Sequence, residues 1–111
     1  MSEERSVLVA SAAGIAIRSL GDVPDVIGAC FGAAGLIITE NDLAPAFFDL
    51  RTGLAGEVFQ KFTNYSLRLA VVLPDPEIYG ERFGELAYEH RNHPLIRFVR
   101  SEREARAWLQ A

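Results

Sequence analysis

Between residues 40 and 56 the chain gathers side chains that could bind an anion, a cation or a partner protein. Three acidic residues, one arginine and one threonine lie near two phenylalanines and two glycines, at positions Glu40, Asp42, Phe47, Phe48, Asp49, Arg51, Thr52, Gly53 and Gly56. From Leu54 onward apolar residues recur at helical spacing, so this cluster falls where a helix begins and its free backbone N–H groups point outward. We expect the functional site here.

The segment from Asp49 to Gly53 has two interpretations. It could be a switch or ligand loop, because the amides of a helix start attract an anion, and phosphorylation of Thr52 would add roughly −1.5 to −2 charges. It could instead be a plain helix start, in which Asp49 or Thr52 caps the free amides and Arg51 neutralises Asp49. In either case we expect Gly53 and Gly56 to let the helix approach the neighbouring strand.

Four carboxylates could gather at the end of a strand, from Glu40, Asp42, Asp49 and Glu57. Oxygen ligands of this kind suit Mg²⁺ or Ca²⁺. The regular spacing of a calcium loop is absent, however, and a solvated acidic rim is the favoured interpretation.

The histidines and the cysteine give no catalytic arrangement. His90 and His93 could supply two metal ligands, but no third His and no second Cys is available, so we interpret them as residues favoured by a helix C-terminus. Cys30 lies on the apolar face of a predicted helix, where a thiol is usually inert. We predict no catalytic residue, no metal and no cofactor.

The two phenylalanines follow Pro45 in a loop-like stretch. Aromatic residues are most often part of a core, but an exposed pair, Phe47 and Phe48, would suit a protein partner or a dimer contact.

The elements that must position this stretch alternate along the chain. We predict strands at residues 7–10, 15–20, 36–39, 67–73 and 95–99, and helices at residues 22–34, 54–65 and 78–91. A capping box of Ser101 and Glu104 opens a short closing helix, whose buried face is Ala105, Trp108 and Leu109. The first two strands are separated by four small residues, which favours an N-terminal hairpin. The fold class is therefore α/β, with a hairpin followed by a mostly parallel sheet of about five strands and about four helices. Ligands of such sheets bind beyond the carboxyl ends of the strands, which again indicates residues 40–53.

Length and composition indicate one globular domain over residues 1–111. Half of the residues are hydrophobic and 23% are charged, which excludes a disordered chain. The net charge of −4 and the single lysine argue against a nucleic-acid partner. The acidic N-terminus and its short, interrupted apolar run resemble neither a secretory signal nor a membrane span, and one cysteine fits a reducing compartment. We expect a cytoplasmic protein with no membrane partner.

The element order, with FFDLRTGLAG in its middle, resembles the STAS domain, which is the fold of bacterial anti-sigma factor antagonists and of the cytoplasmic tails of sulfate transporters. In that family a strand leads to a loop reading roughly aromatic, apolar, Asp, Ser, Ser, Gly, Leu, Gly, and the next helix starts there. This chain has one additional residue between Asp49 and Gly53. The family's phosphorylated serine has no clear counterpart, and Thr52 is the nearest hydroxyl.

Two longer segments, DLAPAFFDLRTGLAGEVFQKF and FVRSEREARAWL, are similar to a family of small bacterial proteins grouped as domain of unknown function 4180. This resemblance implies the architecture and no activity. Together the observations predict a non-enzymatic, STAS-like regulatory module that binds a protein partner, or a second copy of itself as a homodimer, through residues 42–56. The alternatives are a domain that binds a small molecule or anion at residues 40–56, and a structural subunit without a site.

Overall fold

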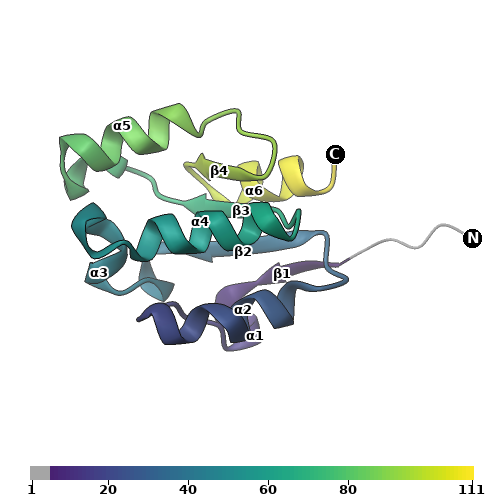
Figure 1. The fold of residues 1–111 in the computed structure, drawn as a ribbon. Helices are drawn as coiled ribbons and strands as arrows, with labels where there is room; N and C mark the ends of the chain where they lie inside the picture. The colour runs from purple at the N-terminus through teal and green to yellow at the C-terminus, as the bar shows by residue number, and fades with distance from the viewer. Residues whose placement is uncertain (1–5) are drawn as a thin grey trace, which may run out of the picture.

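The computed structural model describes residues 6–111 as alternating strands and helices (Figure 1). Part of the acidic N-terminus, on which the expectation of no secretory signal rests, lies outside the described residues. The strands are β1 (Val7–Val9), β2 (Gly35–Thr39), β3 (Leu69–Val72) and β4 (Ile96–Val99). The α-helices are α1 (Ala10–Ala13), α2 (Val23–Cys30), α3 (Pro45–Phe48), α4 (Leu54–Asn64), α5 (Glu81–Glu89) and α6 (Glu102–Leu109). Short 3-10 helices are η1 (Leu20–Asp22), η2 (Glu40–Asp42), η3 (Leu50–Thr52) and η4 (Pro76–Tyr79).

All four strands of the sheet run parallel, and their order in space, β1-β2-β3-β4, is their order in the sequence. The α/β class and the parallel sheet are therefore confirmed. The register aligns Leu36 with Leu69 and Leu69 with Ile96. Strands β2 and β3 occupy the centre, and all but one of their residues are buried, as a continuous apolar run predicts for a strand covered on both faces.

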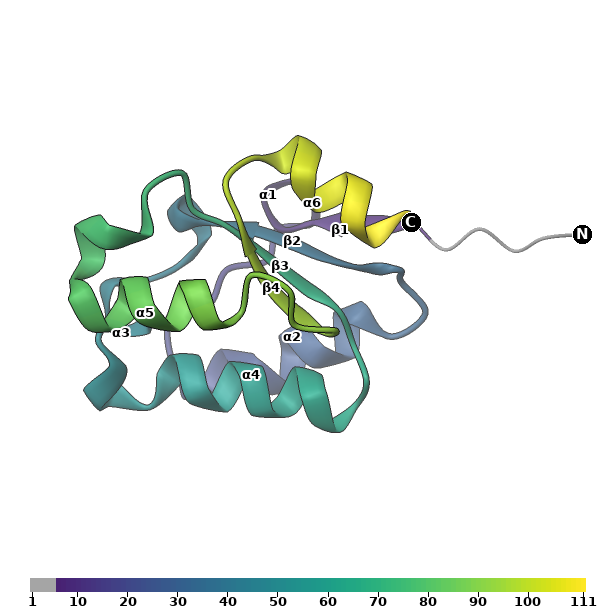
Figure 2. The same cartoon turned by 90° about the horizontal axis from the view of Figure 1, so that it is seen from above.

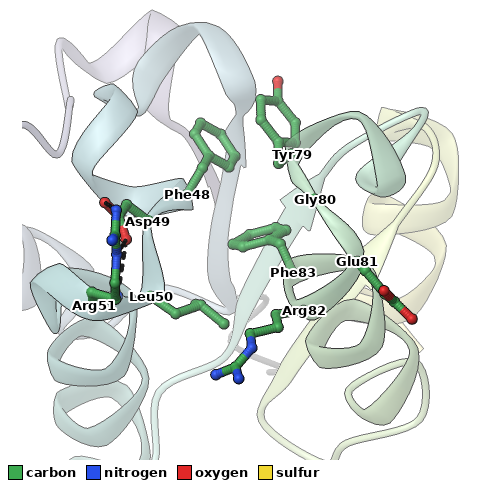
Figure 3. Close-up of a pocket in the computed structure, with 9 residues that line it drawn as sticks. All are labelled: Phe48, Asp49, Leu50, Arg51, Tyr79, Gly80, Glu81, Arg82 and Phe83. Carbon is green, nitrogen blue, oxygen red and sulfur yellow. Dashed lines mark hydrogen bonds and ion pairs between the residues drawn. The ribbon is translucent and has the colours of Figure 1, made fainter.

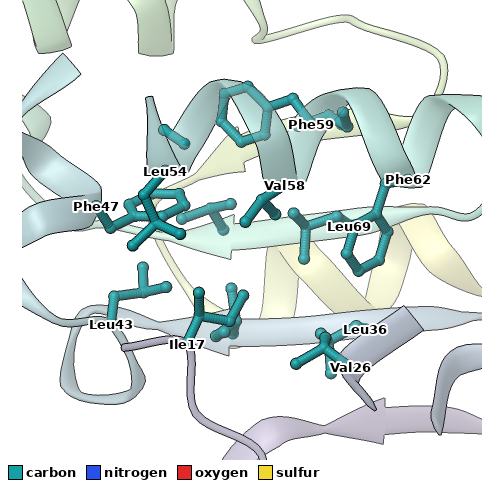
Figure 4. Close-up of a cluster of buried hydrophobic side chains, with 14 of the residues drawn as sticks. Ile17, Val26, Leu36, Leu43, Phe47, Leu54, Val58, Phe59, Phe62 and Leu69 are labelled. Atoms are coloured by element: carbon teal, nitrogen blue, oxygen red, sulfur yellow. The ribbon is translucent and has the colours of Figure 1, made fainter. Parts of the chain in front are cut away.

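Two apolar layers enclose the sheet. One face packs against α2, α4 and α5 through alternate strand residues such as Leu36 and Ile38, and Figure 4 shows part of this cluster around Phe47 and Phe62. The opposite face packs against α6, whose Ala105 and Leu109 meet the intervening strand residues. Figure 2 shows α4 and α6 on opposite sides of the sheet.

The predicted N-terminal hairpin is wrong. After β1 the chain turns into the single helical turn α1, and Ile17 forms only an isolated parallel bridge with Leu43. Ile17 is nonetheless wholly buried. The apolar run at residues 15–20 thus does contain a buried residue, but it is not a strand. The small residues before it form a helical turn that ends at Gly14, whose φ of 71° lies in the left-handed region.

The four longer helices lie where the sequence predicts them, with two differences at their ends. Helix α2 ends at Cys30, four residues earlier than predicted, so that Phe31 leaves the apolar face and is 57% exposed. The helix predicted at residues 78–91 is interrupted at Gly80, whose φ of 109° is inaccessible to a regular helix. The single-turn helices α1 and α3 are additions to the prediction.

Candidate functional site

A cleft of about 680 Å³ opens at the carboxyl edge of the sheet (Figure 3). It separates the segment after β2, residues 48–51, from the segment after β3, residues 79–83. The two strands are parallel neighbours, so the segments that follow them emerge side by side. The edge predicted to hold the site therefore does carry a hollow, and that hollow has two walls.

Aromatic rings line the cleft from both walls. The rings of Phe48 and Tyr79 are stacked, with centroids 3.8 Å apart and planes 9° apart. Phe83 meets both of them edge-on, at centroid distances of 5.2 Å and 5.9 Å. Phe83 is itself buried beneath the stack, and Phe47 is wholly buried in the core, so Phe47 and Phe48 do not form an exposed pair. Phe48 alone of the two is available to a ligand.

Tyr79 is the last residue of η4, and the break at Gly80 separates it from α5. The Tyr79 hydroxyl donates a hydrogen bond to the carboxylate of Glu40, which directly follows β2, and this bond fastens the second wall to the end of that strand. Burial, followed by this hydrogen bond to Glu40, raises the pKa of Tyr79 to about 12. Tyr79 is therefore a neutral hydrogen-bond donor throughout the ordinary pH range, and Glu40 is engaged with it.

The segment from Asp49 to Gly53 has the geometry of a helix start. The Asp49 carboxylate accepts bonds from the Arg51 backbone N–H and guanidinium, all at 3.1 Å, and the side-chain bond holds the pKa of Asp49 below its usual range. The Thr52 hydroxyl lies 2.6 Å from the Ala46 carbonyl oxygen, and it accepts the Leu54 N–H at 3.2 Å. Gly53 has a φ of 79° at the position before α4. Of the two interpretations from sequence, this arrangement matches capping by Asp49 and Thr52.

Two further predicted site residues have local structural roles. Asp42 accepts bonds from the backbone N–H and the hydroxyl of Thr39, both at 3.0 Å, and thereby caps η2. Gly56 is exposed, and a Cβ atom added to it would meet no atom within 4 Å. The same holds for Gly53, so the expectation that Gly53 and Gly56 let α4 approach the neighbouring strand is wrong, because both glycines face solvent.

Two arginines line the cleft, Arg51 and Arg82, and the sequence analysis did not select Arg82. Figure 3 shows its side chain pointing towards the space between the two walls, near Leu50, whereas Glu81 points away. Within residues 6–111, Arg82 has no carboxylate at ion-pair distance, while Arg51 is paired with Asp49. Arg82 can therefore bind an external anionic group without first losing a partner.

The cleft continues into neighbouring hollows on either side. One, of about 340 Å³, shares Phe48, Asp49 and Tyr79 and extends to Leu43 and Pro45. Another, of about 510 Å³, shares Leu50, Glu81 and Arg82 and extends along α5 past three glutamates, at positions 81, 85 and 89. Together they form an elongated surface that is apolar at one end, cationic at Arg82 and acidic at the other end.

Metal binding has no support in the described geometry. Within residues 6–111, no three His, Cys, Asp or Glu side chains lie close enough together to hold an ion. His90 places Nδ1 2.9 Å from the Leu86 carbonyl oxygen at the C-terminus of α5, and His93 Nδ1 accepts the N–H groups of Leu95 and Ile96. Cys30 is buried, and this burial raises its pKa to about 11. Both histidines and the cysteine thus have structural explanations.

Comparison with known proteins adds a family to this geometry. The model of a domain of unknown function, DUF4180, matches residues 2–109. The chain belongs to the DUF4180 family. Neither curated proteins nor solved structures give a match to this DUF4180 chain. In residues 6–111, moreover, each helix is too short or too polar to cross a membrane.

A sequence signal for the second wall exists in hindsight. Residues 74–80, PDPEIYG, follow a predicted strand and carry two prolines and a glycine around an exposed Ile78 and the cleft residue Tyr79. In a parallel sheet this turn must emerge next to the turn after the preceding strand if the two strands are neighbours. Whether the two strands are neighbours depends on the order of strands in the sheet, which the local sequence pattern does not predict.

Proposed function

We propose that this DUF4180 protein is a non-enzymatic, cytoplasmic regulatory module with a STAS-like fold, which binds an extended segment of a partner protein along the cleft and its neighbouring hollows. The observation that carries the proposal is the elongated surface around the Phe48–Tyr79 stack. The STAS-like assignment is supported by the run from β2 through the helix start at Leu54, where the family's loop is also followed by a helix.

The chemistry of the surface specifies the partner segment. The half-buried, stacked rings of Phe48 and Tyr79 favour an apolar or aromatic anchor. Next to it, the unpaired guanidinium of Arg82 favours a carboxylate. The glutamates at positions 85 and 89, farther along α5, favour a basic side chain. The preferred segment is therefore an apolar residue, then an acidic residue, then a basic residue.

Selection from a random peptide-display library on the immobilised protein tests this order directly. We expect enriched sequences to combine an aromatic or large aliphatic residue with Asp or Glu nearby, followed by Lys or Arg. Arg82→Glu should weaken a selected peptide about tenfold or more, because a charged hydrogen bond is lost and repulsion replaces it. Arg103→Glu is the matched control, since it makes the same charge change on α6, across the sheet. A library without enrichment, or equal losses in the two variants, would contradict the proposal.

A second candidate is the binding of a small organic anion, and the volume of the cleft favours it. About 680 Å³ falls within the range of roughly 300–1,000 Å³ typical of small-molecule sites. An apolar body would lie against Phe48 and Tyr79, with its carboxylate on Arg82. A thermal-shift series with aromatic carboxylates separates the candidates: stabilisation that Arg82→Glu abolishes, without peptide enrichment, would favour the small ligand.

A structural subunit without a site requires both phenylalanines to be wholly buried and the acidic residues to point to solvent. Phe47 meets the first condition, but Phe48 is only half-buried and Glu40 accepts the hydrogen bond of Tyr79. The geometry therefore supports this candidate least.

A further inference from the structure

A groove of about 280 Å³ runs between α2 and α4, on the face of these helices that is turned away from the sheet. Figure 1 shows the two helices next to each other on the same side of the sheet. The groove is lined by Leu20, by residues of α2 and α4, and by Phe31 and Tyr65 at the ends of these helices. It does not include any residue of the cleft.

Exposed apolar side chains concentrate at this groove. Leu20, Phe31 and Tyr65 are 55%, 57% and 53% exposed, and they are three of the six large apolar side chains most exposed in the described part of the chain. The rings of Phe31 and Tyr65 meet edge-on, with centroids 5.5 Å apart. A clustered aromatic surface of this kind is typical of a protein interface, whereas scattered exposed residues are not.

Gly28 gives an independent sign that another backbone approaches here. It lies within α2 and lines the groove, and a Cβ atom added to it would meet no atom within 4 Å. Glycine destabilises a helix interior relative to alanine, so its presence needs a reason. Packing inside the protomer does not supply one, since no atom of a neighbouring element lies close to the position of that Cβ atom. Contact with a second helix backbone would supply it.

Two charges at the groove are complementary to each other under a two-fold rotation. Glu57 and Lys61 both line the groove, one helical turn apart on α4. Neither forms an ion pair with any other side chain of residues 6–111. A two-fold axis passing between them places each Glu57 opposite Lys61 of the second copy, and the reverse, because an isologous contact repeats every interaction.

We infer that the α2–α4 groove is the interface of a homodimer related by a two-fold axis that crosses α4 between Glu57 and Lys61. Phe31 and Tyr65 provide its apolar contacts and Gly28 its close approach. A second copy is the occupant because the two-fold rotation sets Glu57 of each protomer opposite Lys61 of the other. The surface is therefore complementary to itself. This inference does not depend on ligand binding in the cleft.

Sedimentation equilibrium over a concentration series tests the interface through a charge swap. Glu57→Lys and Lys61→Glu should each weaken dimerisation about tenfold or more, because each places like charges opposite one another twice per dimer. The double variant carrying both changes should return to within a few-fold of the wild-type dissociation constant. A double variant as weak as the single variants, or a wild-type protein that is monomeric at high micromolar concentration, would overturn the inference.

Two further variants separate the interface from the fold. Gly28→Gln should weaken the dimer while leaving the thermal unfolding temperature of the dilute monomer unchanged or raised, since a better helix former enters open space. Tyr65→Ala should also weaken the dimer, whereas Tyr88→Ala, which removes a similarly exposed ring on α5, should not. Equal behaviour of the two tyrosine variants, or a Gly28→Gln protein that dimerises as well as wild type, would assign the contact elsewhere.

Discussion

Protonation of His93 should destabilise the fold, because its ring accepts two backbone hydrogen bonds that only the neutral form can accept. Nδ1 lies 3.1 Å from the Leu95 nitrogen and 3.0 Å from the Ile96 nitrogen, at the start of β4. Burial, together with the positive charges of His90 and Arg97, lowers the pKa of His93 from its ordinary value of 6.5. A lowered pKa in a base means that the folded state binds the proton more weakly than the unfolded state does.

The sign and size of the effect follow from this contact. Stability due to neutral His93 is fully present above the unfolded pKa of 6.5, and it is lost as the pH falls through 6.5 towards the lower folded pKa. Two backbone donors lose their acceptor, at about 0.5–1.5 kcal/mol each. Proton linkage of a single group between an unfolded pKa of 6.5 and about pH 5 limits the total loss to about 2 kcal/mol, so the free energy of unfolding should fall by about 1–2 kcal/mol.

Urea unfolding of wild type and His93→Asn between about pH 8 and about pH 5 measures this loss. The asparagine oxygen can occupy the position of Nδ1 and accept the same N–H groups without titrating. We expect the stability of the wild type to fall more steeply than that of His93→Asn below about pH 6.5. Parallel pH profiles for the two proteins would refute the reasoning, because the remaining histidine, His90, is common to both.

The remaining predictions concern the glycine that begins β2 and the threonine that precedes α4. Gly35→Ala should lower the free energy of unfolding by about 1–3 kcal/mol, because the added Cβ atom would overlap the Leu109 side chain and lie 3.1 Å from the Arg68 carbonyl oxygen. The control is Gly56→Ala, whose added Cβ atom points into open space. Equal chemical denaturation curves for the two variants would contradict the expectation. Thr52→Val should cost about 1 kcal/mol, because the first N–H of α4, that of Leu54, loses the hydroxyl that accepts it, whereas Thr52→Ser should retain this bond. A valine variant as stable as the serine variant would show that the hydroxyl is dispensable.

The sequence predicts most of the fold because burial and periodicity coincide in the longer elements. The run at residues 36–39 has no polar alternation, and β2 is indeed covered on both faces. Ser101 accepts the Glu104 N–H at 3.2 Å, as the pattern before α6 predicts. The run at residues 15–20 fails as a strand because an apolar residue such as Ile17 can be buried from an irregular segment as fully as from a strand.

Half of the candidate site could be located from sequence. A polar loop after a central strand indicates the carboxyl edge of a sheet, and residues such as Phe48 and Asp49 do line the cleft. Tyr79 and Arg82 belong to the segment that follows β3, and they lie near Phe48 and Asp49 only because β3 is the neighbour of β2 in the sheet. The sequence also could not predict whether Asp42 and Thr52 cap a helix or bind a ligand. A hydroxyl or carboxylate at a helix start has the same sequence pattern in both cases.

The match between sheet order and sequence order has a consequence for how the chain folds during its synthesis. Each strand pairs with the strand that follows it in the sequence, so no pairing has to wait for a segment made much later. The first three strands with α2 and α4 can therefore assemble as the ribosome releases them, and β4 with α6 is added last, at the growing edge. Until α6 emerges, the apolar face beneath it, around Ile37 and Val72, stays open to water. The final eight-residue helix is thus the step that closes the nascent domain.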